Sequence, residues 1–164
     1  RLRRSALFPF FMLYDDNGNR TYPLSQIASM QHDSANDKEA AALNLKEGDD
    51  VIRIQRIRLL EDQPVINESI VLPAVRFPDF PVESNTLPNA LYEYYYQQFG
   101  VLIVKATENL QAVLPDALDL KQLHLKGAKP LLEIRRRAFD VDGNVVEIRR
   151  SRVITSRHHY HIEL

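Results

Sequence analysis

A repeated unit of a short helix, a strand, a turn and a second strand most constrains how this chain can fold. Four residues of the first copy recur 79 positions later, with Gly48 matched by Gly127, Arg56 by Arg135, Arg58 by Arg137 and Glu68 by Glu147. One such match would be expected by chance, but four at a single offset favour an internal duplication. The alternative is that hairpins following short helices tend to look alike. Either way, two antiparallel strand pairs are predicted.

The remaining elements follow from hydrophobic periodicity and from capping and breaking residues. The predicted strands are residues 8–14, 51–60, 65–72, 101–107, 130–139 and 145–154. The predicted helices are residues 36–45, 89–99 and 116–125. Three prolines between residues 77 and 88 predict an irregular connection before the second of these helices.

Length and composition exclude several classes of protein. A chain of 164 residues fits one domain. Lys and Arg total 21 against 22 Asp and Glu, so the chain lacks the basic excess of an autonomous DNA-binding module. Cysteine is absent, which excludes disulfides and thiol chemistry. No apolar run approaches the roughly 18 residues of a membrane span. The sequence also contains no phosphate-binding Gly-rich loop, G-x-S-x-G or H-E-x-x-H motif.

The first hairpin places charges on an apolar strand face. Alternate residues of a strand share a face, so Arg56 and Arg58 lie on the same side as Ile54. On the returning strand, Glu68 lies among isoleucines and leucines. Two guanidinium groups and one carboxylate leave a surplus positive charge that a small anion could balance. An exposed strand pair with cross-strand salt bridges is the alternative.

Three other clusters carry weaker signals. Arg135, Arg137 and the following basic strand could suggest nucleic acid, but neighbouring carboxylates and overall neutrality argue against it. His159 and His161 share a strand face but have no third ligand nearby, so a metal site is not expected. Tyrosines at helical spacing in residues 92–96 are typical of the edge of a core.

The order of the motifs resembles a known family. The run Leu43-x-Leu45-x-x-Gly48-x-x-Val51-x-x-Ile54-x-Arg56-x-Arg58 is followed by Pro64-Val65-x-x-Glu68, Leu72-Pro73, Ala90-Leu91-Tyr92-Glu93, Phe99-Gly100 and Asp142-Gly143-x-Val145-Val146-Glu147. This series is similar to the UTRA domain, the effector-binding half of GntR-type transcription regulators of the HutC subfamily. The similarity covers almost the whole chain.

The resemblance implies an α+β fold of the chorismate-lyase type, with a central antiparallel sheet and flanking helices. It implies residues 9–164 as the effector-binding domain, and residues 1–8 as the end of a linker from an upstream winged helix-turn-helix domain. The full protein would then be a cytoplasmic homodimer, with no membrane association. A small anionic metabolite would shift its operator binding, as a repressor, without a cofactor, a metal or enzymatic activity.

The resemblance also implies a set of ligand-binding residues. Arg56 and Arg58 match the arginines that hold the anionic group, Glu68 and Glu147 match two acidic positions, and Tyr92 matches an aromatic one. Three positions depart from the pattern, namely Ala90 for serine, Val153 for tyrosine and Ser156 for aspartate. Fewer polar contacts disfavour an amino-sugar phosphate and favour a smaller or more apolar organic acid. Two alternative functions are a chorismate-lyase-type enzyme and a dimerisation module that senses nothing.

Overall fold

The computed structural model describes residues 12–164. Its strands are β1 (Leu13–Asp15), β2 (Leu24–Ser34), β3 (Asp50–Leu60), β4 (Gln63–Pro73), β5 (Ile103–Val113), β6 (Leu131–Asp140), β7 (Val145–Val153) and β8 (His158–Tyr160). Its helices are α2 (Asp37–Leu43), α3 (Leu91–Phe99) and α4 (Ala117–Gln122), with 3-10 turns η1 (Ala74–Arg76) and η2 (Val82–Ser84). The proposed linker, residues 1–8, and most of the strand predicted at 8–14 lie outside the described residues.

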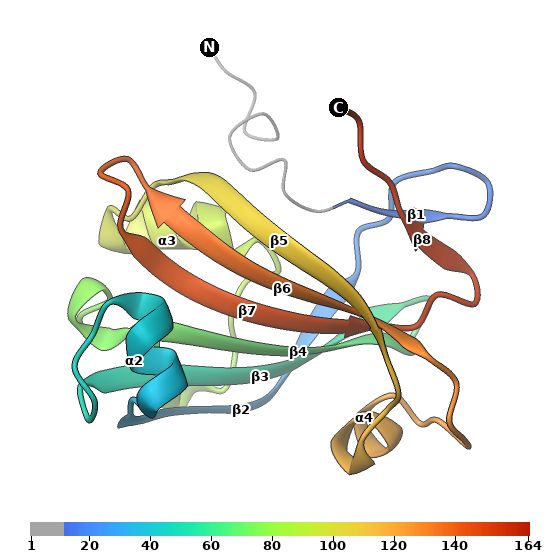
Figure 1. The fold of residues 1–164 in the computed structure, drawn as a ribbon, viewed down its shortest axis with the longest axis horizontal. Helices are drawn as coiled ribbons and strands as arrows, with labels where there is room; N and C mark the ends of the chain where they lie inside the picture. The colour runs from blue at the N-terminus through green and yellow to red at the C-terminus, as the bar shows by residue number, and fades with distance from the viewer. Residues whose placement is uncertain (1–11) are drawn as a thin grey trace.

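A six-stranded antiparallel sheet in the order β2-β3-β4-β7-β6-β5 forms the centre of the fold (Figure 1). Strands β1 and β8 pair with each other as a separate two-stranded sheet, here called the β1–β8 ribbon. The predicted α+β architecture with a central antiparallel sheet is therefore confirmed. Among the described residues, no helix is long and apolar enough to cross a membrane.

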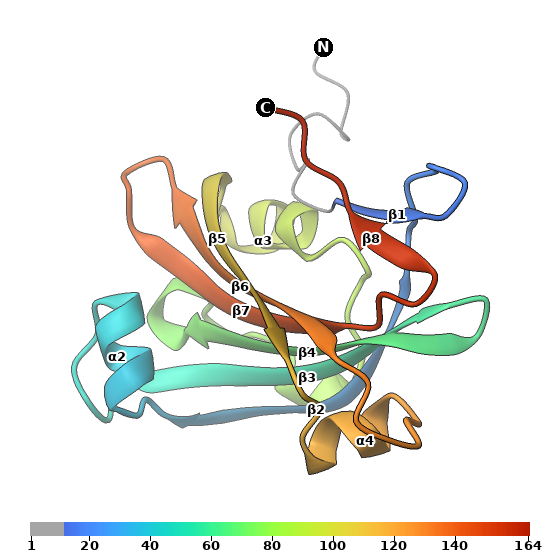
Figure 2. The same cartoon turned by 45° about the vertical axis from the view of Figure 1, so that its right-hand side comes forward.

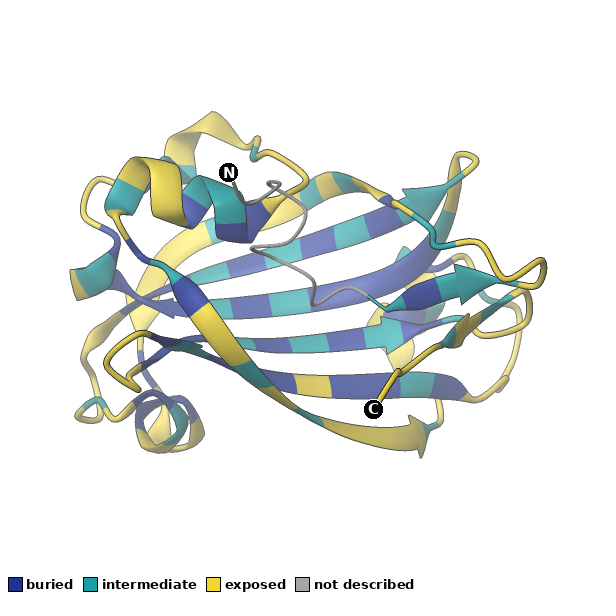
Figure 3. Cartoon of the chain, turned by 90° about the horizontal axis from the view of Figure 1, so that it is seen from above, coloured by how far each residue is buried: buried dark blue, intermediate teal, exposed yellow. Residues whose placement is uncertain are grey.

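The two faces of the sheet have different covers (Figure 2). Helix α3 and the β1–β8 ribbon lie over one face, here called the α3 face, and helices α2 and α4 lie over the other. Along the central strands, buried and less buried residues alternate (Figure 3). On the α3 face, Ile54 and Ile70 pack against Tyr95 of α3. On the opposite face, Val51 packs against Leu43 of α2. The sheet thus has an apolar core on both sides.

The internal repeat predicted from the sequence is visible in the order of elements. The unit β2-α2-β3-β4 is followed by β5-α4-β6-β7, and the sheet order is symmetric about the β4–β7 contact. Both repeat helices begin with a capping box, Asn36 with Glu39 in α2 and Asp116 with Asp119 in α4. In each box the cap side chain accepts from the third helical amide and the acidic side chain accepts from the cap amide.

The register of the repeat differs from the prediction by one residue. Arg56 lies opposite Glu68 across β3 and β4, and the matching pair across β6 and β7 is Arg136 opposite Arg149. The predicted counterparts Arg135 and Arg137 are exposed. The caps of α2 and α4 are 80 residues apart, not 79, and the bulges after Arg58 and Ala138 have the same spacing. A slip of one residue moves a side chain to the other face.

The element boundaries also differ from the predicted ones in places. Helix α2 ends earlier than predicted because Asn44 adopts the left-handed conformation, with φ of 54°. Strand β5 extends to Val113, well past the predicted residue 107, because it pairs with β6 along its whole length. Long-range strand pairing, which local patterns do not report, sets this boundary.

Candidate functional site

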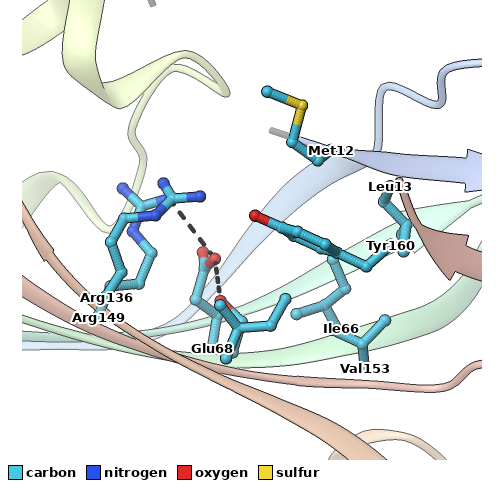
Figure 4. A pocket seen from close by; sticks show the side chains of 10 residues that line it. Met12, Leu13, Ile66, Glu68, Arg136, Arg149, Val153 and Tyr160 are labelled. Atoms are coloured by element: carbon cyan, nitrogen blue, oxygen red, sulfur yellow. Dashed lines mark hydrogen bonds and ion pairs between the residues drawn. The ribbon is translucent and has the colours of Figure 1, made fainter. Parts of the chain in front are cut away.

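A cavity lies on the α3 face, between the central strands and the β1–β8 ribbon (Figure 4). Its walls are Met12, Leu13, Ile66, Glu68, Ile134, Arg136, Arg149, Ser151, Val153 and Tyr160. Its free volume is about 20 Å³, which is room for a single water molecule. The surface that lines the cavity is mostly nonpolar, and its charged groups lie together at one end.

The first charged group in this cluster is Glu68, whose carboxylate accepts from several donors. Arg56 donates its Nε–H to Glu68, and only 1% and 2% of the two side chains are exposed. The Ser151 hydroxyl donates to the other oxygen at 2.9 Å, and Nη1 of Arg149 lies 3.6 Å from that oxygen. Burial raises the pKa of Glu68, but the guanidinium groups, Arg56 first, outweigh it and hold this pKa well below its usual range.

The second buried carboxylate, Glu147, is held by residues from α3 and β7. Its oxygens accept from the hydroxyls of Tyr92 at 2.9 Å and Tyr95 at 2.7 Å. Arg149 donates from Nε at 2.8 Å and from Nη2 at 2.9 Å. Glu147 is thus fixed by charged and neutral donors together, and it positions the guanidinium of Arg149 at the cavity wall.

Arg136, on β6, connects α3 to the edge of the sheet. It donates to the Tyr92 hydroxyl oxygen at 3.2 Å and to Glu108 of β5 at 3.1 Å. The guanidinium carbons of Arg149 and Arg136 lie 5.0 and 5.8 Å from the Tyr92 ring centroid. Burial, followed by the nearby charge of Glu147, raises the pKa of Tyr92 to about 12, so the phenol stays protonated and remains a donor.

This face carries more positive than negative charge. Four buried arginines, Arg56, Arg58, Arg136 and Arg149, share it with the carboxylates Glu68, Glu108 and Glu147, which leaves one positive charge over among these seven groups. The pKa of Arg58 is lowered to about 9, mainly by burial and next by repulsion from Arg56. Guanidinium groups gathered in this way are suited to bind an anion, because each offers several N–H donors.

The two copies of the repeat differ in the residues that lie opposite each other across their strands. Across β3 and β4 the paired residues are Arg56 and Glu68, which have opposite charges. At the matching place across β6 and β7, Arg136 lies opposite Arg149, and both line the cavity. Like charges directly opposite each other on neighbouring strands destabilise a sheet. The second copy of the repeat thus has an arginine where the first has the neutralising carboxylate.

The structure brings all five predicted site residues onto the α3 face, but not into equivalent places. Glu68 lines the cavity, and Arg56 lies directly behind it. Tyr92 and Glu147 hold the cavity arginines from the side of α3. Arg58 is buried further along β3, where it donates to the Pro23 carbonyl at 3.0 Å. Direct ligand contact by Arg56 and Arg58 therefore remains a prediction. Their positive charges help to lower the pKa of Glu68.

The residues where the sequence departs from the family pattern also have defined places. Val153 is part of the cavity wall, and Ala90 lies at the N-cap of α3 without a side-chain hydrogen bond. Ser156 is exposed, outside the cavity. Two of the three departures thus remove polar groups at or beside the site.

Sequence reasoning missed most of the cavity lining. On β7, residues 147, 149 and 151 share one face by simple alternation, so Arg149 and Ser151 could have been found once Glu147 was chosen. Arg136 was hidden by the one-residue error in the repeat offset. Glu108 and Tyr160 reach the site through tertiary pairing and have no local signal.

The described part of the chain offers no cluster of three or more His, Asp or Glu side chains that could hold a metal ion. His159 and His161 of the C-terminal segment instead pack against Tyr14, with ring centroids 6.4 and 4.8 Å away. The chemistry of the cavity is therefore that of guanidinium groups beside a nonpolar wall.

Known proteins are similar to this chain in sequence and in fold. The family model described as the UTRA domain matches residues 20–159. A solved ligand-binding domain of a GntR-family transcriptional regulator from Bordetella bronchiseptica is 26% identical, with a TM-score of 0.87, over 100% of this chain and 99% of that chain. An HTH-type transcriptional repressor of Salmonella typhimurium is 30% identical over 105 residues, which is 64% of this chain and 42% of the relative.

A further relative is the mannosyl-D-glycerate transport/metabolism system repressor MngR of Escherichia coli. It is 25% identical over 66% of this chain and 45% of its own length. The matched regions thus span less than half of these curated relatives.

Proposed function

Because this chain belongs to the UTRA domain family, we propose that it is the effector-binding domain of a one-component transcription regulator, and that its effector is a small anionic metabolite. The observation that carries this proposal is the Arg136–Arg149 pair at the cavity wall, where the other copy of the repeat has an Arg–Glu pair. The fold alone would not support a sensor, since one fold serves many functions.

An anion fits this pair for electrostatic and geometric reasons. Guanidinium groups bind carboxylates and phosphates through paired N–H donors, and such bonds are stronger in a site that excludes water. Glu147 and Glu68 hold Arg149, and Glu108 holds Arg136, before the ligand arrives. Less of the binding energy is then lost in ordering these long side chains.

In the proposed full protein, a winged helix-turn-helix domain precedes this chain, and two copies form a cytoplasmic homodimer. The relatives matched here are repressors, which supports the same role for this protein. The effector would favour the dimer geometry that it binds more tightly, and operator affinity would change through that shift in population. A ligand that binds both geometries equally would have no effect.

Thermal unfolding against a panel of sugar phosphates, organic acids and phosphonates tests the sensing role. A ligand at 100 times its dissociation constant adds about 2.7 kcal/mol, enough to raise Tm by several degrees. The shift should disappear in Arg149→Ala and persist in Arg150→Ala, because residue 150 is the next on β7 and faces the other side. A shift that survives in Arg149→Ala, or no shift with any anion, would contradict the proposal.

A further inference from the structure

The Tyr160 side chain forms part of the cavity wall. It extends from β8 toward the two arginines and lies over the nonpolar end of the site (Figure 4). Its hydroxyl donates to Glu108, and the other oxygen of Glu108 accepts from Arg136 at 3.1 Å. The phenol is therefore connected to the charged cluster through one carboxylate.

The ring of Tyr160 packs against a nonpolar cluster that is separate from the main core. This cluster contains Leu13 of the ribbon, Ile66 of β4, Ile134 of β6 and Val153 of β7. The walls around the ring thus provide hydrocarbon contacts, and the charged groups begin only beyond its hydroxyl end. A nonpolar slot that ends at guanidinium groups matches a molecule with a hydrocarbon body and an anionic head.

The cavity as it stands is too small for such a molecule. About 20 Å³ holds one water, whereas any organic acid needs several times more. The charged end is closely packed, because Arg136, Arg149 and Glu68 all contact neighbouring groups. The Tyr160 ring comes from a three-residue strand that pairs only with β1, so its departure opens the site with the least disruption of the sheet.

We propose that Tyr160 is a specificity-determining residue whose ring fills the subsite for the nonpolar part of the effector, which is a carboxylate with a compact hydrocarbon body that displaces this ring. The inference rests on the proposed sensing function and adds the chemical class of the ligand. Sugar hydroxyls would lose their hydrogen bonds to water against these hydrocarbon walls.

Displacement of Tyr160 also gives the ligand a mechanical effect. Tyr160 pairs with Leu13 in the ribbon, and the amide of His161 donates to the Met12 carbonyl at 2.9 Å. When the ring leaves the cavity, β8 and β1 therefore move together. Strand β1 lies at the N-terminal end of the described chain, on the side where the proposed DNA-binding domain joins.

Isothermal titration calorimetry with benzoate, cyclohexanecarboxylate and glucose 6-phosphate tests this assignment. The proteins are the wild type, Tyr160→Ala, Tyr160→Phe and the control Tyr22→Ala, whose ring is 73% exposed. Tyr160→Ala should lower the Kd of the two carboxylates at least tenfold, because the ligand no longer competes with the ring. Tyr160→Phe, which loses only the bond to Glu108, should lower it less, and Tyr22→Ala should leave it unchanged.

The outcomes separate the ligand class from the sensing function. If glucose 6-phosphate binds the wild type and neither carboxylate binds any variant, the ligand class is wrong and the sensing function stands. If the carboxylates bind Tyr160→Ala and Tyr22→Ala with equal affinity, the ring subsite is wrong. If no probe binds any of the four proteins, both proposals are wrong. Tyr160→Phe retains the ring and its packing, so the test does not depend on the alanine variant alone.

Discussion

Replacing Glu68 with glutamine tests the charge balance of the α3 face. The carboxylate is 2% exposed, and the Arg56 side chain that it neutralises is 1% exposed. Glutamine keeps the shape and can still accept from Ser151, but its amide group presents N–H donors toward guanidinium donors. The substitution therefore leaves a buried arginine without its counter-charge.

The expected loss of stability follows from the geometry of this pair. Removing one partner from a buried ion pair costs about 3–5 kcal/mol, against about 0.5 kcal/mol or less for a surface substitution. Because the Ser151 bond is retained, we expect a value near the lower limit, about 3 kcal/mol. Urea unfolding measures it, and Glu47→Gln is the matched control because Glu47 is exposed and the change in net charge is the same.

The same variant should respond more strongly to anions. With Glu68 neutral, four arginines face two carboxylates, so phosphate should stabilise Glu68→Gln more than it stabilises Glu47→Gln at equal ionic strength. If the two variants have the same urea midpoint, the buried charge is not costly and the reasoning fails. Equal stabilisation by phosphate would show that the surplus positive charge does not attract anions.

Three further predictions concern single contacts and pH. Tyr92→Phe removes the donor to Glu147 and an acceptor of Arg136, and urea unfolding should show a loss of about 1–3 kcal/mol. Asn36→Ala removes the α2 cap and should cost about 1 kcal/mol in the same assay. Folding lowers the pKa of Glu68 below its ordinary 4.5, because the arginines outweigh burial. This stabilisation is therefore complete above that pH and lost as the pH falls through the folded value, so urea midpoints measured between about pH 6 and pH 3 should fall less steeply in Glu68→Gln.

Much of the secondary structure could be predicted because its causes are local, but strand β2 was not predicted. Alternation along β3 placed Arg56 and Arg58 on one apolar face, which is buried. The Asn36 cap located α2, and Pro115 and Gly127 on either side located α4.

The alternative of an exposed strand pair with cross-strand salt bridges was wrong about exposure, although the cross-strand bridge between Arg56 and Glu68 does form. A strand pattern does not show that α3 and the ribbon cover the face. The cover comes from tertiary packing, which the residues of the strand itself do not indicate.

The residues of the candidate site were less predictable because they depend on register. The repeat offset is 79 by sequence matches and 80 by helix caps, and this difference decides whether Arg135 or Arg136 faces the cavity. Three consecutive arginines, residues 135–137, let the sequence match at either offset, and the bulges after Arg58 and Ala138 agree with the offset of 80. Glu108 and Tyr160 join the site from an edge strand and a terminal strand, whose partners are fixed only when the whole sheet forms.

The difference between the two copies of the repeat bears on why the proposed anion site lies beside only one of them. Two identical copies would present the same paired residues twice, once across β3 and β4 and once across β6 and β7. In the first copy Glu68 neutralises Arg56, so that position holds a closed ion pair. In the second copy Arg149 takes the place of the carboxylate, and each arginine takes its counter-charge from another position, Arg149 from Glu147 and Arg136 from Glu108. We therefore expect that divergence at one position of the duplicated hairpin is what brings two guanidinium groups together at the proposed anion site.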